Sequence, residues 1–169
     1  NGSIQKVKEL VNEIFDAWMP MQFENESNPD IHRKTTALEI INDFPEGFDY
    51  MITGVGSGGH ITGVGEVLKE RFKNLKILAV EPEASPVLSG GKSGAHKIQG
   101  IGAGFIPKIG NQTIIDDSIL VSHEQAYKYA GMLARSEGLF AGISTGASLA
   151  AIASRLESIA SGAKLLTFA

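Results

Sequence analysis

The stretch of this sequence with the clearest chemical potential is a glycine-rich loop at residues 54–60. It reads Gly-Val-Gly-Ser-Gly-Gly-His and lies between an apolar run, 48–53, and a segment with helical spacing, 61–72. Glycine lets the backbone adopt positive φ and lets a ligand approach without a Cβ in the way, while a helix N-terminus adds free N–H groups and partial positive charge. The loop is therefore predicted to bind an anion such as phosphate, with further hydrogen bonds available from Ser57 and His60.

Two other interpretations of this loop stay open on the residues alone. The glycines could merely form a tight turn between a strand and a helix, although they are more numerous than a turn requires. Gly54, Gly56 and Gly59 also satisfy the G-x-G-x-x-G pattern, and Glu81 ends the next apolar run. The separation along the chain between the glycine pattern and Glu81 is close to the spacing of about 20 residues at which dinucleotide-binding domains place a ribose-binding acid. Taken alone, the motif would favour a dinucleotide.

The segments around the loop alternate between short apolar runs and helical periodicity. Strands are expected at 48–53, 75–80, 114–121, 139–143 and 164–168. Helices are expected at 3–15, 28–42, 61–72, 124–136 and 145–159. Ser3 lies near the expected N-cap of the first helix, and Asn28 and Pro29 are expected to start the second. Short apolar runs joined by helical crossovers indicate a parallel sheet covered on both faces. The predicted fold class is α/β: a three-layer sandwich with a mostly parallel central sheet flanked by helices.

Two local features refine this outline. Ser122 and Gln125 have the spacing of a capping box and should start the helix at 124–136. Residues 81–108 are rich in Gly, Pro and Ser and contain only short apolar stretches. A connection of that length is uncommon in a compact domain unless it has a function, so a functional loop is expected there.

Composition limits the classes of partner. With 169 residues, 43% of them hydrophobic, the chain can bury one substantial core. A net charge of −4 without clustered Lys or Arg argues against nucleic acid and against an anionic membrane surface. The absence of cysteine excludes disulfides and thiolate metal sites and fits a reducing, cytoplasmic compartment. No apolar run reaches the roughly 20 residues that span a bilayer. The expected partner is a small molecule or another protein.

The isolated polar residues carry little chemistry. His32, His96 and His123 have no second ligand at metal spacing, so no metal is expected. Asp116 and Asp117 are neighbours on an expected strand, where successive side chains point to opposite faces. They are therefore expected to be solvated and not to act as an acid–base pair.

Several motifs in the same order resemble the cysteine synthase (O-acetylserine sulfhydrylase) family of fold-type II pyridoxal-phosphate enzymes. Residues 56–63 resemble the loop that grips the phosphate of the cofactor, whose fifth position, here His60, is commonly threonine in the family. Segments 80–90, 96–107 and 142–147 agree with the same family. The resemblance implies a tryptophan synthase β-like fold and pyridoxal 5′-phosphate as cofactor. It assigns cofactor binding to Gly56, Ser57, Gly58, Gly59, His60 and Ser144.

The resemblance also implies roles for two further parts of the site. The residue that matches Ser144 hydrogen-bonds the pyridine nitrogen, and a neutral hydroxyl there is consistent with β-elimination rather than transamination. A helix N-cap is the plainer interpretation of Ser144, and one hydroxyl could serve both purposes. Residues matching Gly100 and Ala103 border the cofactor and shape the space for a compact substrate, although glycines in such a stretch could simply fold a loop.

The resemblance divides the chain into two parts. Residues 1–18 would be the end of a small N-terminal domain, a helix, and residues 19–169 the larger domain that binds the phosphate, truncated at both ends. The family's Schiff-base lysine and its substrate-clamping loop match no segment, and Lys97 resembles an ordinary member of the 96–107 motif. No catalytic residue is therefore expected in this chain, which would be a fragment inactive by itself.

The function implied by the resemblance is β-replacement, in which O-acetylserine and sulfide give cysteine and acetate. Family members are commonly homodimers, and some cysteine synthases bind the C-terminal tail of serine acetyltransferase. Three alternatives remain open: a cystathionine β-synthase-like enzyme of the same family, a NAD-binding oxidoreductase domain, and a non-enzymatic anion- or nucleotide-binding module.

Overall fold

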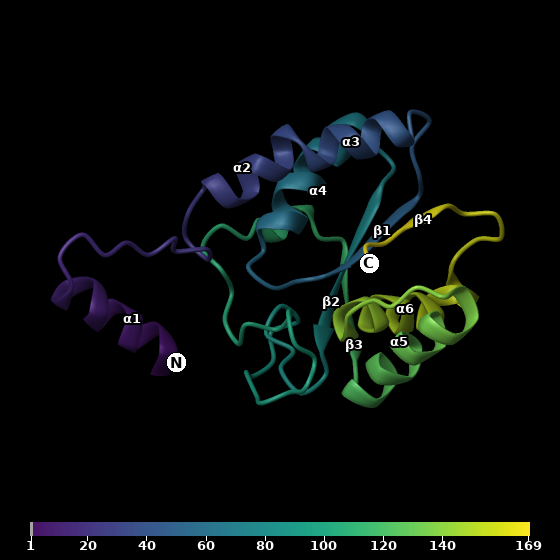
Figure 1. Ribbon diagram of the computed structural model, residues 1–169. Coiled ribbons are helices and arrows are strands. Elements are labelled where there is room, and N and C mark those ends of the chain that lie inside the picture. The colour runs from purple at the N-terminus through teal and green to yellow at the C-terminus, as the bar shows by residue number, and fades with distance from the viewer. Residues whose placement is uncertain (1) are drawn as a thin grey trace.

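A four-stranded parallel sheet forms the centre of the molecule. The computed structural model describes residues 2–169 (Figure 1). The strands are β1 (Tyr50–Gly54), β2 (Lys76–Pro82), β3 (Asp117–Val121) and β4 (Leu165–Leu166). They lie in the order β3-β2-β1-β4, and Met51 of β1 pairs with Ile77 of β2 and Leu166 of β4. The predicted α/β class with a parallel central sheet is confirmed.

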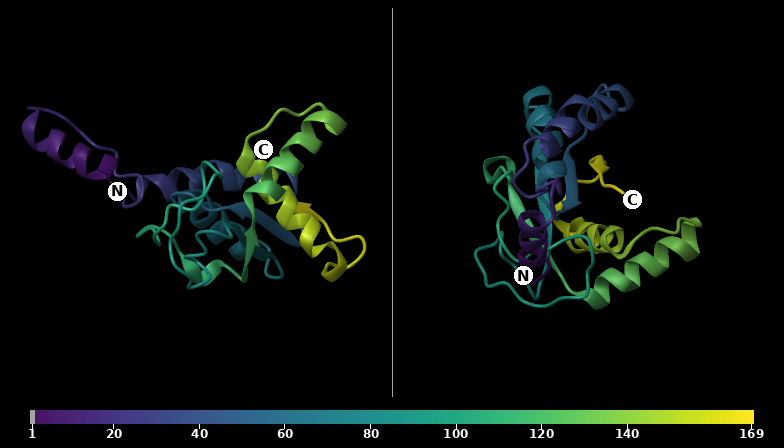
Figure 2. Two further views of the ribbon diagram at one scale, coloured as in Figure 1. Left: turned by 90° about the horizontal axis from the view of Figure 1, so that it is seen from below. Right: turned by 60° about the vertical axis from the view of Figure 1, so that its left-hand side comes forward.

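Helices cover both faces of this sheet. On one side lie α2 (Ser27–Lys34), α3 (Thr36–Asp43) and α4 (Gly59–Arg71), and on the other α5 (His123–Glu137) and α6 (Ile143–Arg155) (Figure 1). Two single turns, η1 (Gln112–Ile114) and η2 (Leu156–Ser158), complete these layers. The first helix, α1 (Gly2–Glu13), projects away from the layers (Figure 2). The expected three-layer arrangement is therefore present.

The strands divide their apolar side chains between two cores. Because successive side chains on a strand point to opposite faces, neighbours along β1 and β2 enter different cores. The α4 side buries Met51, Ile77, Ala79, Val64 and Leu68, and the α6 side buries Ile52, Leu78, Val80, Ala147 and Ala151. Burial on both faces explains why these strands are continuous apolar runs in the sequence.

The strand order of the sheet reverses beside β1. The chain passes from β1 to β2 and β3 on one side and returns to β4 on the other side of β1. In open α/β sheets, ligands bind outside the carboxyl ends of the strands where the strand order reverses in this way. The glycine-rich loop leaves β1 at this position, so the topology and the loop indicate the same place.

Two predicted elements differ from the structure. The strand expected at 139–143 is absent: Leu139 is 54% exposed, Phe140 is 98% exposed, and Ile143 already begins α6. The prediction was wrong because this segment is the exposed connection between α5 and α6, which pack on each other. The helix expected from residue 28 to about 42 is interrupted at Thr35, where φ is −125° and ψ is −78°.

The expected helix starts are partly confirmed. The capping box of Ser122 and Gln125 is present at the start of α5. Asn28 lies inside the first turn of α2, whose N-cap is Glu26, and Ser3 lies inside α1. An Asn or Ser residue therefore predicted approximately where each helix begins, but it did not identify the capping residue. The exact first residue of a helix depends on contacts outside the helix.

Asp116 and Asp117 are both exposed, as expected, and Asp117 also pairs with Arg155 at 2.7 Å, while Asp116 has further partners. Its carboxylate accepts a hydrogen bond from the Ile77 amide at 2.8 Å and pairs with Lys69 at 2.6 Å and Lys76 at 3.2 Å. The lysines and this amide bond hold the pKa of Asp116 below its usual value, against the opposing effect of burial. Asp116 thus joins α4, β2 and the approach to β3.

Glu81 organises the beginning of the long loop that follows β2. It is only 2% exposed, and its carboxylate accepts hydrogen bonds from the Leu88 and Ser89 amides, each at 2.8 Å, and from the Ser89 hydroxyl. A buried charge is tolerated when hydrogen bonds compensate its lost hydration. Glu81 therefore fixes the turn at residues 83–91 against the end of β2.

Glu81→Gln is expected to lower the free energy of unfolding by about 2 kcal/mol or more, because a neutral amide replaces a carboxylate that accepts several hydrogen bonds inside the protein. Urea denaturation followed by circular dichroism measures this loss. The matched control is Glu83→Gln, which changes an exposed carboxylate two residues away and should leave stability nearly unchanged. Equal effects of the two substitutions would contradict this role for Glu81.

Candidate cofactor site

The glycine-rich loop leads directly from β1 into the N-terminus of α4. Gly58 is the N-cap of α4, with φ of 82°, and no side chain caps this helix end. The N–H groups of the first turn have no partner within a helix, so an uncapped N-terminus offers several donors and a partial positive charge to one anion. The structure therefore fits a phosphate group at this position.

Three separate segments meet at this loop. A Cβ added to Gly56 would lie 2.5 Å from the Gly100 carbonyl oxygen, so only glycine permits this approach. Gly100 itself has φ of 97°, and a Cβ there would lie 3.7 Å from Ser144 Oγ in the first turn of α6. Residues predicted from the sequence to share a site, Gly56, Gly100 and Ser144, are thus neighbours in space.

Ser144 is not the N-cap of α6. That position belongs to Gly142, and Ser144 lies in the first turn, partly buried. The capping interpretation is therefore wrong, and the hydroxyl is not committed to closing the helix. Ser144 Oγ lies next to the Gly100 loop.

His60 has aromatic neighbours on two sides. Its ring lies edge-to-face with Phe168, at 4.3 Å between ring centroids, and with His32, at 5.2 Å. Burial, together with the nearby His32, lowers the pKa of His60 to about 4. At neutral pH His60 is therefore an uncharged imidazole with a single N–H donor, and it brings no positive charge to the anion site.

Asn28 contacts the loop and was not recognised from the sequence as part of a site. Its side-chain amide donates to the Gln22 carbonyl oxygen at 2.7 Å and to Ser57 Oγ at 3.0 Å. A Cβ added to Gly59 would lie 2.0 Å from Asn28 Oδ1, which shows how closely α2 approaches the start of α4. The Asn-Pro pair had indicated only a helix start, because nothing in the sequence links residue 28 to residue 57.

Ala103 is exposed and also borders a small cavity beside the site. With Gly56 and Gly102 it lines a cavity of about 10 Å³, roughly the space of one water molecule. Gly102 adopts φ of 68° and its carbonyl oxygen lies 2.8 Å from His96 Nε2. The stretch after Gly100 thus folds as a tight turn with internal contacts, and both Gly100 and Ala103 are exposed.

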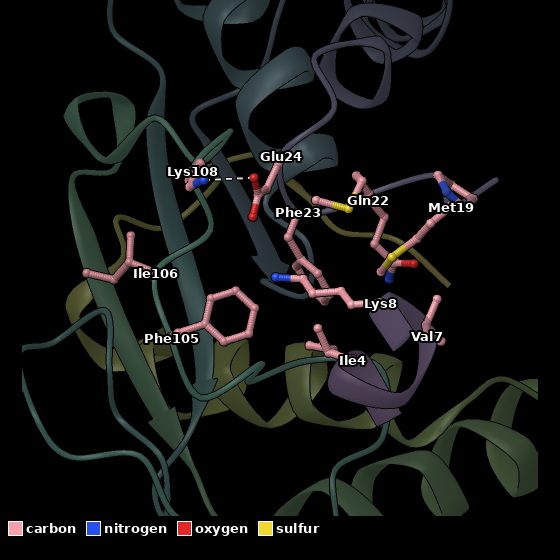
Figure 3. A pocket seen from close by; sticks show the side chains of 12 residues that line it. Ile4, Val7, Lys8, Met19, Gln22, Phe23, Glu24, Phe105, Ile106 and Lys108 are labelled. Atoms are coloured by element: carbon pink, nitrogen blue, oxygen red, sulfur yellow. Dashed lines mark hydrogen bonds and ion pairs between the residues drawn. The ribbon is translucent and has the colours of Figure 1, made fainter. Parts of the chain in front are cut away.

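An apolar cavity of about 350 Å³ lies between α1 and the rest of the molecule (Figure 3). Side chains from α1 and from residues 19–24 face Phe105, Ile106 and Lys108 across it. Phe23 and Phe105 pack edge-to-face at 5.0 Å, and Lys108 pairs with Glu24 at 2.7 Å. No sequence pattern indicates this cavity, because its walls come from segments that lie far apart along the chain.

The structure gives the dinucleotide interpretation no support. Glu81, the candidate ribose-binding acid, is buried and uses its carboxylate to hold residues 88 and 89. Residues 2–169 contain no group of three or more His, Cys, Asp or Glu side chains placed to hold a metal ion. Of the helices that the structure describes, none has the length and apolar character needed to cross a bilayer.

Comparison with known families decides between the interpretations. Residues 1–169 match the family described as pyridoxal-phosphate dependent enzyme. The chain belongs to this family. The resemblance inferred from the motifs and the predicted cofactor are confirmed, and neither a NAD-binding oxidoreductase domain nor a cofactor-free binding module agrees with this assignment.

Its relatives include cysteine synthases. The chain is 55% identical to a cysteine synthase of Flavobacterium sp. over 141 residues, which are 83% of this chain and 46% of the relative. It is 45% identical to a cysteine synthase of Staphylococcus aureus over 168 residues, 98% of this chain and 54% of the relative. The chain therefore spans about half the length of these relatives.

Solved structures show the same fold. An O-ureido-L-serine synthase matches 99% of this chain and 53% of its own length, with a TM-score of 0.94 and 35% identity. An O-acetylserine dependent cystathionine β-synthase from Helicobacter pylori matches 98% of this chain and 54% of its own length, with a TM-score of 0.91 and 38% identity. The backbone described here thus resembles about half of each of these enzymes.

The buried, uncharged His60 should make stability depend on pH. Unfolded His60 takes up a proton near its usual pKa of about 6.5, whereas folded His60 does so only near pH 4. The uncharged His60 therefore contributes fully to the free energy of unfolding above about pH 6.5. As the pH falls toward 4, up to roughly 3 kcal/mol of this free energy is lost. His60→Phe should flatten the unfolding free energy across this range.

Urea denaturation at a series of pH values measures this effect. Burial also lowers the pKa of His32, which remains in the variant. A smaller slope of the unfolding free energy against pH, with the same sign, should therefore persist. The control His123→Phe replaces a histidine whose side chain is 38% exposed and should keep the steep dependence. An unchanged slope in His60→Phe would contradict the assignment.

Proposed function

We propose that this chain forms the phosphate-binding part of a pyridoxal-phosphate enzyme that carries out β-replacement of the cysteine synthase type. Residues 19–169 would constitute the larger, cofactor-binding domain, and residues 1–18 the end of a smaller one. The observation that carries the proposal is the meeting of the uncapped α4 N-terminus with Gly100 and Ser144 at the point where the strand order reverses.

Each part of this arrangement has a chemical task. Backbone N–H groups of residues 56–60, apart from that of Gly59, which points at Ser57 Oγ, hold the phosphate together with the Ser57 hydroxyl, and the helix dipole favours its negative charge. The Ser144 hydroxyl hydrogen-bonds the pyridine nitrogen and keeps it neutral, and the missing side chain at Gly100 leaves room for substrate. When bound, pyridoxal phosphate supplies an electron sink for the substrate carbon next to the amino group.

The substrate class follows from the relatives. Cysteine synthases are among the relatives described above, so the proposed reaction replaces the acetoxy group on the β-carbon of O-acetylserine with sulfide and releases acetate. A cystathionine β-synthase-like reaction is the second candidate, and the O-acetylserine dependent enzyme from Helicobacter pylori favours it as a variant of the same chemistry. Both candidates share an activated serine as the amino-acid substrate and differ in the incoming thiol.

The lysine that would hold the cofactor covalently is not among the residues of the proposed site. Lys97 is exposed, and Lys69, Lys76 and Lys108 pair with carboxylates elsewhere. Without such a lysine no side chain here would remove the proton from the substrate carbon. We therefore propose that this chain binds the cofactor reversibly and is inactive alone. A homodimer and a serine acetyltransferase tail are proposed partners of the whole enzyme in the cytoplasm.

The isolated chain is expected to bind pyridoxal phosphate in competition with inorganic phosphate, as followed by absorbance titration. Gly58→Ala should weaken binding by about tenfold or more, because a Cβ at φ of 82° strains the N-cap of α4. Gly90→Ala is the matched control: Gly90 has the same φ of 82°, with open space around its Cβ position. Equal affinities of the two variants would contradict phosphate binding at this loop.

Borohydride reduction of the complex followed by peptide mass mapping should label no single lysine stoichiometrically. The same preparation should form no cysteine from O-acetylserine and sulfide. Stoichiometric labelling of one lysine, Lys97 included, together with turnover would overturn the proposal that this chain lacks the catalytic residue.

A further inference from the structure

We propose that Asn28 is a positioning residue of the phosphate site. Its side chain orients the Ser57 hydroxyl so that this hydroxyl can only donate a hydrogen bond to the bound phosphate. This inference rests on the proposed function of the loop. It concerns a residue on α2, 29 positions away from Ser57 in the sequence.

The orientation of the Asn28 amide is set by its partners. The Gln22 carbonyl oxygen can only accept, so the atom 2.7 Å away must be Nδ2. The other Nδ2 hydrogen points to Ser57 Oγ at 3.0 Å, and both hydrogens of the amide are then used. Asn28 Oδ1 lies against Gly59, where a Cβ would come within 2.0 Å of it. The side chain is therefore held on three sides.

Ser57 is left with a single way to complete its hydrogen bonding. A serine hydroxyl has two acceptor lone pairs and one donor hydrogen. Ser57 Oγ accepts from Asn28 Nδ2, and the Gly59 amide also points at it from 3.4 Å, a longer contact. Both lone pairs thus face donors, so the remaining hydrogen is directed outward. A hydroxyl arranged in this way can bind a ligand atom that accepts a hydrogen bond, such as a phosphate oxygen, and disfavours a ligand atom that donates one.

A purely structural role for Asn28 explains less. It is not the N-cap of α2, which is Glu26, and no side chain caps that helix. The contact between α2 and α4 is already made by backbone, because a Cβ on Gly63 would lie 2.2 Å from the Pro29 carbonyl oxygen. The amide group of Asn28 is therefore not needed to join the helices, and its hydrogen bonds are directed at Gln22 and Ser57.

The test is a double-mutant cycle on the affinity for inorganic phosphate and for pyridoxal 5′-phosphate, measured by calorimetry on the full chain. Asn28→Ala and Ser57→Ala should each weaken binding by about tenfold. The double variant should be no weaker than Ser57→Ala, because Asn28 acts through the hydroxyl. The control Asn74→Ala, at an exposed position after α4, should bind as the unaltered chain does.

A second variant separates positioning from folding. Asn28→Asp keeps the size of the side chain but has no donor for Gln22 or Ser57, so it should weaken binding at least as much as Asn28→Ala. Circular dichroism should show that both variants are folded. If neither variant changes the affinity, or if the losses of Asn28→Ala and Ser57→Ala multiply in the double variant, the inference is overturned. If the unaltered chain binds neither ligand, the proposed function fails and the inference fails with it.

Discussion

The site depends on how closely neighbouring segments can approach the loop after β1 and the first turns of α4. Gly56 admits the carbonyl group of Gly100, Gly59 admits the side chain of Asn28, and Gly63 admits the backbone of α2. A single Cβ at any of these positions would overlap a neighbouring atom. The glycines are therefore required by contacts within the chain itself, in addition to the space that they leave for an anion.

This close packing leaves the N-terminus of α4 free of side-chain caps. Helices usually satisfy their first N–H groups with a Ser, Thr, Asp or Asn side chain, and here Gly58 occupies the capping position. Apart from the Gly59 amide, which points at Ser57 Oγ, these donors stay available beside the Gly100 turn. The neutral His60 adds no charge at this end, so the attraction for phosphate comes from backbone N–H groups and the helix dipole.

The fold and most of the site residues could be predicted because their signals are local. Apolar runs gave β1, β2 and β3, the capping box gave the start of α5, and the glycine pattern gave the loop. The strand expected at 139–143 failed for the opposite reason. An apolar run shows that a segment avoids water in some context, but only neighbouring strands decide whether it pairs in a sheet.

The sequence by itself determined the family, the cofactor and the α/β class, because these follow from motifs of a few adjacent residues and from short periodicities. Only the tertiary structure decided that Asn28 meets Ser57, that Glu81 holds a turn and not a ribose, and that His60 is buried beside Phe168. Each of these contacts joins residues whose distance in space depends on how helices and strands pack. That packing is a property of the whole chain and leaves no pattern in any one segment.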